Sequence, residues 1–265
     1  MNAAAPRPDL FAAGASGPAQ LIGRSFARHR PLIAAIVVWA LAFVALGAVI
    51  IGLGLLLTHV LLPAGLGADD ASWSRWFVPE RTPTLNTVTR IGSDLGSSGV
   101  ILALSAISGV ALVIGRYWRQ LAFLFFALTL EFGVFLVTTM IVARHRPTVP
   151  QLDAAPPTSS FPSGHTASAL TLYVGAAIVL TSLVRGTRAR TLVWVLAILL
   201  PVGVAISRLY RGMHFPTDVA ASVLLSVAAL LFALLAVRSM AAAATERDLR
   251  VTASPPADSP REAAS

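Results

Sequence analysis

Six long apolar segments dominate this sequence and limit the folds that it can adopt. A helix needs about 20 mostly apolar residues to cross the hydrocarbon core of a bilayer, where every backbone hydrogen bond must be satisfied internally. The segments cover residues 32–57, 98–115, 121–143, 165–184, 191–206 and 219–237. The sequence therefore predicts an all-α, polytopic membrane protein built as a six-transmembrane-helix bundle.

The composition agrees with a membrane protein and excludes several kinds of site. Hydrophobic residues make up 56% of the chain and charged residues 12%. Without any cysteine, the chain can form neither a disulfide framework nor a thiolate metal site. The net charge of +8 comes from arginines that lie mainly between apolar segments, without interleaved aromatic residues. We therefore expect no nucleic-acid partner.

The two ends of the chain differ from the part between them. Residues 1–29 are rich in Ala, Pro and Gly, and residues 239–265 end in Ser, Pro and charged residues, so both are expected to be disordered cytoplasmic tails. Residues 30–238 form the predicted six-span domain. The first apolar segment is too long for a signal-peptide core and is interpreted as a retained anchor. Residues 69–97 mix Trp, Phe and Arg, which suits the headgroup layer.

Arginine placement predicts the orientation of the bundle. One side of a six-span arrangement carries most of the arginines between segments, and by the positive-inside rule that side is the cytoplasm. These residues are Arg24, Arg28, Arg30, Arg116, Arg119, Arg185, Arg188, Arg190 and Arg238. The opposite side carries Arg75, Arg81 and Arg90, and also Arg144, Arg146, Arg208 and Arg211. The last four depart from the rule and need another explanation.

Two loops on the outer side combine arginine with histidine. The loop between the third and fourth segments contains Arg144-His145-Arg146-Pro147 and ends in Phe161-Pro162-Ser163-Gly164-His165. The loop between the fifth and sixth segments runs from Ser207-Arg208 through Arg211 and His214 to Asp218. We expect the two loops to meet on one face of the membrane.

These residue types suit phosphoryl transfer. Guanidinium groups offer paired donors to phosphate oxygens, and Ser163 with the free N–H groups at a helix start forms an anion site. Asp218 follows His214 by one helical turn, so it can bind one ring nitrogen and leave the other free to attack. His165 can protonate the leaving group. The outer catalytic loops offer only Asp153 and Asp218 as carboxylates, so no metal site and no cofactor are expected.

The ordered motifs RP, PSGH and SR-x5-H-x3-D resemble those of the type 2 phosphatidic acid phosphatase superfamily, in its membrane lipid phosphatase branch. The resemblance covers about residues 30–238. It implies that His214 is the nucleophile that forms a phosphohistidine, that Asp218 orients it, and that His165 is the general acid. The implied phosphate-binding residues are Arg146, Arg208, Ser163 and Gly164.

One position departs from the family pattern. A lysine usually stands seven residues before the arginine of the RP motif, and here that position is Thr139. The hydroxyl of Thr139 is expected to bond back to the preceding helical turn. Arg144 is a candidate replacement for the missing cation, although contact with lipid headgroups is an alternative. For Arg211, headgroup contact is the favoured interpretation.

Three further polar residues have less defined roles. Glu131 lies near the middle of the third segment, where an ionisable side chain usually faces the bundle interior, and a structural hydrogen bond is favoured over a direct part in the reaction. His59 and His145 are interpreted as interfacial residues. An accessory role is left open for His145, which neighbours the site.

The predicted function is a metal-independent phosphatase that hydrolyses a lipid phosphate monoester or diphosphate at the extracytoplasmic side of the cell membrane. By resemblance, the substrates are phosphatidic acid, phosphatidylglycerophosphate or a polyprenyl diphosphate such as undecaprenyl diphosphate. The expected partners are the lipid substrate and the bilayer, and the oligomeric state is left open. Alternatives are a lipid phosphotransferase and a non-catalytic lipid transporter or scaffold. Soluble vanadate-dependent haloperoxidases share the motifs, but the six spans exclude them.

Overall fold

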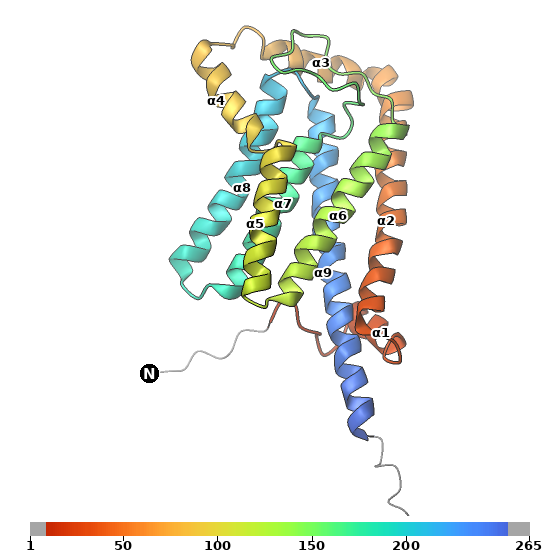
Figure 1. Ribbon diagram of the computed structural model, residues 1–265. Coiled ribbons are helices and arrows are strands. Elements are labelled where there is room, and N and C mark those ends of the chain that lie inside the picture. Colours follow the sequence, from red (N-terminus) through yellow and green to blue (C-terminus); the bar gives the residue numbers. More distant parts are fainter. Residues whose placement is uncertain (1–8, 254–265) are drawn as a thin grey trace, which may run out of the picture. The chain divides into compact units, whose positions relative to one another are not determined.

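The computed structural model describes residues 9–253, and within this range the chain consists of helices and loops without a strand (Figure 1). The predicted all-α fold is confirmed. The elements are α1 (Pro18–Ser25), α2 (Pro31–Leu56), the π-helical segment η1 (Leu57–Leu66), α3 (Gly67–Trp76), α4 (Pro83–Asp94), α5 (Ser98–Ile114), α6 (Trp118–Ile141), α7 (Gly164–Leu183), α8 (Thr187–Tyr210) and α9 (Pro216–Ala253).

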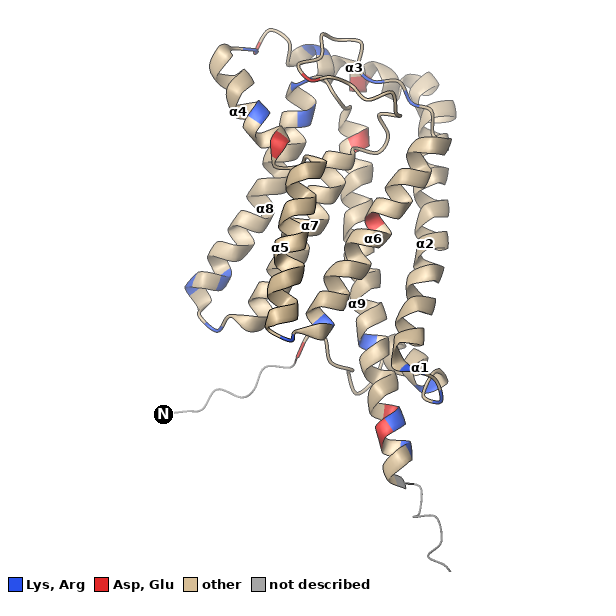
Figure 2. Cartoon of the chain, in the orientation of Figure 1, with Lys and Arg blue, Asp and Glu red and all other residues tan. Residues whose placement is uncertain are grey.

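The predicted spans correspond to α2 and to α5 through α9. Among the described residues, five helical segments are long and apolar enough to cross a membrane: Pro31–Trp76, Trp118–Ile141, Gly164–Leu183, Thr187–Tyr210 and Pro216–Thr252. A sixth span is reached when α4 and α5, which meet at a bend of 44°, are counted together. Figure 2 shows most charged residues of Trp39–Leu234 at the ends of the helices, with one acidic residue, Glu131, in the middle of α6. That distribution is expected where lipid surrounds the middle.

The chain divides into two compact units, one of which is Trp39–Leu234. The other combines the residues up to Val38 with those from Leu235 onward. In that smaller unit Gly23 is buried, and a Cβ there would fall 2.3 Å from the Cβ of Ala242, so only glycine permits this approach. Nearby, Gln20 Nε2 donates to Glu246 Oε1 at 2.8 Å.

The terminal segments differ from the expected disordered tails. Helix α1 occupies Pro18–Ser25, and α9 continues to Ala253, beyond the predicted end of the sixth span at residue 237. The continuation of α9 is rich in alanine, the residue with the highest helix propensity, and contains neither proline nor glycine. Residues 1–8 and 254–265, which the same prediction includes, lie outside the described residues.

The larger unit has a core of small and branched apolar residues. Its buried cluster draws on α2, η1, α6, α7, α9 and the loop between α6 and α7: Ala42, Leu46, Ile50, Leu57, Leu130, Val134, Val142, Phe161, Ala167, Ala221, Leu225 and Ala229. At Gly54 a Cβ would fall 2.7 Å from both Phe161 and Val142. This close approach fixes the α6–α7 loop against α2.

Helices α3 and α4 lie at the same end of the larger unit as the α6–α7 loop (Figure 1). Arg81, between α3 and α4, donates to the carbonyl of Pro150 at 2.7 Å and to that of Tyr210 at 3.0 Å. The Tyr210 hydroxyl in turn accepts from the backbone N–H of Thr82 at 3.2 Å. These contacts join the segment before α4 to the two loops that carry the predicted site.

Candidate active site

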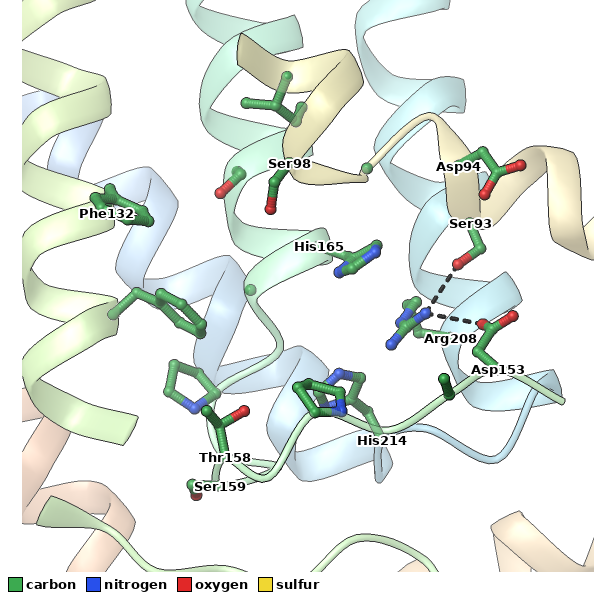
Figure 3. Close-up of a pocket in the computed structure, with 18 of the residues that line it drawn as sticks. Ser93, Asp94, Ser98, Phe132, Asp153, Thr158, Ser159, His165, Arg208 and His214 are labelled. Carbon is green, nitrogen blue, oxygen red and sulfur yellow. Dashed lines mark hydrogen bonds and ion pairs between the residues drawn. The ribbon is translucent and has the colours of Figure 1, made fainter. Parts of the chain in front are cut away.

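Both motif loops open onto one cavity of about 470 Å³ (Figure 3). One wall is apolar and comes from α5 and α6, with Ile101, Leu102, Phe132 and Phe135. The other wall is polar. It is lined by Ser93, Asp94 and Ser98 near the α4–α5 turn, by Arg146, Asp153, Thr158 and Ser159 in the α6–α7 loop, and by Gly164, His165, Ser168, Arg208 and His214.

His214 lies in the loop between α8 and α9 and is 3% exposed. Its Nδ1 is 2.8 Å from the carbonyl oxygen of Ser160, which can only accept a hydrogen bond, so Nδ1 carries the proton. In the neutral ring the lone pair is then on Nε2, which is 3.4 Å from Nη1 of Arg146. Burial lowers the pKa of His214, against the opposing effect of Asp218, and this favours the neutral ring.

Asp218 does not make the hydrogen bond to His214 that the spacing suggests. Its nearest carboxylate oxygen is 3.6 Å from Nδ1, beyond hydrogen-bond distance. That oxygen instead accepts from the backbone N–H of Phe215, the residue before α9, at 2.9 Å. In this structure the carbonyl of Ser160 therefore fixes the ring of His214, and Asp218 acts on it as a nearby charge.

The two motif arginines reach the cavity from different elements. Arg146 lies in the α6–α7 loop and donates from Nη1 to the carbonyl of Met213 at 2.9 Å. Arg208, in the last turn of α8, donates from Nη1 to Ser93 Oγ at 2.9 Å. The Nε atoms of both are buried and without a hydrogen-bond partner among the described residues. Burial also lowers the pKa of Arg146. Each side chain thus keeps donor capacity beside the cavity.

Asp153 accepts hydrogen bonds from Arg208 and from the neighbouring Arg211. Its Oδ2 accepts from Arg208 at 3.0 Å, and both oxygens accept from Arg211, at 2.6 Å and 2.8 Å. Burial alone would raise the pKa of Asp153, but Arg211 and Arg208 lower it, so the group stays ionised. Arg211 is only 4% exposed. The interpretation of Arg211 as a headgroup contact is therefore wrong.

Helix α7 begins at the cavity. Gly164 and His165 are its first residues, and both line the cavity, whereas Ser163 is fully buried and bonds Thr166 Oγ1 at 3.0 Å. A Cβ at Gly164 would fall 2.7 Å from the ring of Phe135, so a larger residue would displace the apolar wall. In Figure 3 the ring of His165 lies on the same side of the cavity as Arg208 and His214.

Arg144, the candidate replacement for the missing lysine, is directed elsewhere. It does not line the cavity, and its two terminal nitrogens bind the carboxylates of Asp70 and Asp218. The expectation for Thr139 is confirmed, because its hydroxyl donates to the carbonyl of Leu136 at 2.9 Å. Sequence reasoning missed Asp70, whose only signal was a carboxylate in a segment assigned to the headgroup layer.

The remaining predictions concern residues outside the cavity. Glu131 is 1% exposed and accepts from Ser168 Oγ at 3.3 Å, which agrees with the favoured structural hydrogen bond. Ser168 itself lines the cavity. His59 and His145 are exposed and do not line it.

Comparison with known proteins assigns this arrangement to a family. Residues 120–240 match the model of the PAP2 superfamily. Over 175 residues the chain is 31% identical to phosphatidylglycerophosphatase B of Bacillus subtilis (strain 168), a match that covers 62% of this chain and 81% of the relative. This chain belongs to the PAP2 superfamily. It is a multi-span membrane protein of the lipid phosphatase type, as the motif resemblance predicted.

A solved PAP2 structure has a similar fold. A crystal structure of a transmembrane PAP2-type phosphatidylglycerolphosphate phosphatase from Bacillus subtilis is 28% identical, covers 78% of this chain and 94% of its own, and has a TM-score of 0.57. Aquifex aeolicus LpxE is 25% identical, covers 61% of this chain and 92% of its own, and has a TM-score of 0.48.

The PAP2 match includes every predicted site residue but not the whole cavity. Ser93 and Asp94 line the cavity and Asp70 contacts Arg144, yet all three precede residue 120, where the match begins. The α4–α5 turn is held close to the site at Gly96, where a Cβ would fall 2.8 Å from the carbonyl of His165. The segments before α6 thus complete a site whose motifs lie after it.

Proposed function

We propose that this PAP2 phosphatase hydrolyses a lipid phosphate through a phosphohistidine formed on Nε2 of His214. The observation that carries the proposal is the tautomer of His214, whose Nδ1–H is bound to Ser160 while the lone pair on Nε2 lies beside Arg146. A neutral, oriented imidazole next to guanidinium donors combines an activated nucleophile with charge stabilisation.

The reaction then proceeds by two in-line transfers. In the first, Nε2 of His214 attacks phosphorus, the bond from phosphorus to the lipid oxygen breaks, and His165 donates a proton to the departing alkoxide. In the second, His165 takes a proton from water, the water oxygen attacks phosphorus, and the P–N bond breaks to release inorganic phosphate. Arg146, Arg208 and the N-terminus of α7 at Gly164 hold the phosphoryl oxygens in both steps.

The same donors support a reaction without a metal. Two guanidinium groups line the cavity and supply the positive charge that the transferring phosphoryl group requires. Among residues 9–253, no group of three or more His, Cys, Asp or Glu side chains could hold a metal ion. Activity should therefore persist in the presence of a chelator.

The substrate and the orientation follow from more general features. The curated relative is a phosphatidylglycerophosphatase, so phosphatidylglycerophosphate is the first candidate substrate, with phosphatidic acid and polyprenyl diphosphates as alternatives. The apolar wall formed by Ile101, Leu102 and Phe132 suits the acyl or prenyl part of such a lipid. The arginine asymmetry supports an extracytoplasmic active site within a catalytic domain of residues 30–238.

The proposal is tested with purified protein in detergent and a panel of lipid phosphates, with and without chelator. Phosphate release should depend on His214, and His214→Ala should abolish both turnover and acid-labile phosphoenzyme. His165→Ala should slow turnover but still form labelled phosphoenzyme from substrates with good leaving groups. Equal labelling of His214→Ala and the parent would show that another residue is attacked.

A further inference from the structure

A sealed cluster of charged side chains adjoins His214 outside the cavity. Arg144 donates from Nη2 to Asp70 Oδ2 at 2.5 Å and from Nη1 to the carboxylate of Asp218. Thr217 links Asp70 to Arg144, because its hydroxyl donates to Asp70 Oδ2 at 2.5 Å and accepts from Arg144 Nη1 at 2.7 Å. The ring of Phe215 lies 4.3 Å below the Arg144 guanidinium. We call Asp70, Arg144, Thr217 and Asp218 the sealed cluster.

None of these ionisable side chains can reach the substrate directly. The side chains of Asp70 and Arg144 are 3% exposed and that of Asp218 is fully buried. None of the three lines the cavity. Two carboxylates and one guanidinium give the cluster a net charge of −1, the same charge that Asp218 alone would present. Arg144 therefore fixes the carboxylate of Asp218, and Asp70 compensates the positive charge that Arg144 introduces.

We propose that Asp70 and Arg144 are positioning residues that hold Asp218 in place and balance its charge, so that His214 is presented to the phosphate as a nucleophile. This inference rests on the proposed role of His214. It assigns to α3, a helix before the PAP2 match, a contribution to the reaction.

The charge of each residue predicts the direction of its effect. The other charged or titratable groups that face His214 are Arg146 from the α6–α7 loop, Arg208 from α8, His165 from α7 and Asp218 from α9. Loss of the negative charge of Asp70 leaves Arg144 uncompensated, which disfavours protonation of His214. Loss of the positive charge of Arg144 leaves two carboxylates, which favours protonation. The two losses should therefore shift the pKa of His214 in opposite directions. Damage to packing alone would not produce such opposite shifts.

The test compares Asp70→Asn, Arg144→Gln and Arg144→Lys with the parent over a range of pH. Asp70→Asn should move the acid limb of kcat/KM to lower pH and Arg144→Gln should move it to higher pH, each by about half a unit. Both should slow phosphoenzyme formation roughly 10- to 100-fold, the cost of a misplaced catalytic group, with little change in KM. Arg144→Lys should keep the parental limb, because the charge remains, and recover part of the rate.

Asp69→Asn is the matched control, since Asp69 neighbours Asp70 on α3 but is exposed. It should match the parent in rate and in limb position. If Arg144→Gln is not monodisperse, Thr217→Val takes its place. This variant removes the hydroxyl between Asp70 and Arg144 and keeps every charge of the sealed cluster, so the rate should fall while the acid limb keeps its position.

Parental rates in Asp70→Asn or Thr217→Val would overturn the proposal, as would limb shifts of the same sign in Asp70→Asn and Arg144→Gln. A rate loss without any limb shift in Asp70→Asn, or an equal limb shift in Asp69→Asn, would also overturn it. Phosphoenzyme that survives His214→Ala would instead refute the proposed function.

Discussion

Two acid–arginine clusters adjoin the candidate site, and they differ in what they can reach. In the sealed cluster the side chains of Asp70 and Arg144 are both 3% exposed and lie off the cavity. In the second cluster, which we call the cavity cluster, Asp153 binds Arg208 and Arg211 and is 26% exposed at the cavity wall. The same pairing of aspartate with arginine therefore occurs once in a buried position and once on the wall of the cavity.

This difference separates two kinds of contribution. A sealed pair has already lost its water, so it influences the reaction only through the neighbour that it holds. An ion pair on the cavity wall is accessible to the substrate. If Arg208 holds the phosphate, as proposed above, Asp153 both supports Arg208 and competes with the phosphate for its guanidinium. Variants of the cavity cluster should change phosphate binding, whereas variants of the sealed cluster should change the behaviour of His214.

The largest effect is expected from Arg208, the arginine of the cavity cluster that is proposed to hold the phosphate. Arg208→Ala removes one of the two guanidinium groups that line the cavity, and phosphoenzyme formation should fall roughly 100- to 1000-fold, the range for one lost transition-state donor. Rapid-quench labelling of the purified variant measures this. Arg90→Ala, which alters an exposed arginine of α4, is the control and should keep the parental rate. A loss below about threefold in Arg208→Ala would remove Arg208 from the transition state.

A smaller effect is expected from its carboxylate partner. Asp153→Asn removes the anion that binds Nη1 of Arg208, so inorganic phosphate should inhibit the variant at concentrations about 2- to 5-fold lower, as expected for a partly exposed ion pair. Product inhibition of turnover measures this. Asp94→Asn is a matched control, since Asp94 is an exposed carboxylate on the same cavity. Equal tightening in both variants would mean that Asp153 acts by general charge, without specific competition for Arg208.

The sequence predicted part of each cluster. Arg144, Arg208 and Asp218 could be placed because each lies in or beside a motif at the end of an apolar segment. Their partners Asp70 and Asp153 could not, because both lie outside the motifs and the apolar segments, Asp70 on the short helix α3 and Asp153 in an irregular loop. Arg211 was misjudged for the same reason: without knowledge of Asp153, an arginine at a membrane boundary suggested a headgroup contact.

Backbone groups were also beyond the reach of sequence patterns. The spacing of His214 and Asp218 correctly indicated proximity, but the hydrogen bond that fixes the ring comes from the carbonyl of Ser160, which any residue would supply. Six apolar segments, in contrast, predicted six helices, because lipid leaves the backbone few alternatives. The fold could thus be predicted in outline, and of the site only the side chains that belong to the motifs.

The smallest effect is expected for the acid limb of kcat/KM in Asp153→Asn, which should stay near its parental pH and thereby distinguish the two clusters. Because burial lowers the pKa of His214, the ring should remain neutral below its usual value near 6.5, and the acid limb of kcat/KM should lie below that pH. The pKa of Asp153 is also lowered, so Asp153 stays charged across this limb and does not contribute a proton to it. Its side chain is 26% exposed, so water screens the loss of its charge more strongly than in the sealed cluster, where Asp70 is 3% exposed. Asp153→Asn should therefore shift the acid limb by less than about 0.3 pH unit, unlike the variants of Asp70 and Arg144.

Full pH profiles of kcat/KM for Asp153→Asn and for Asp70→Asn, measured side by side, make the comparison direct. Equal shifts in the two would mean that His214 responds to the total charge around the site, and the distinction between a sealed and a cavity cluster would not hold.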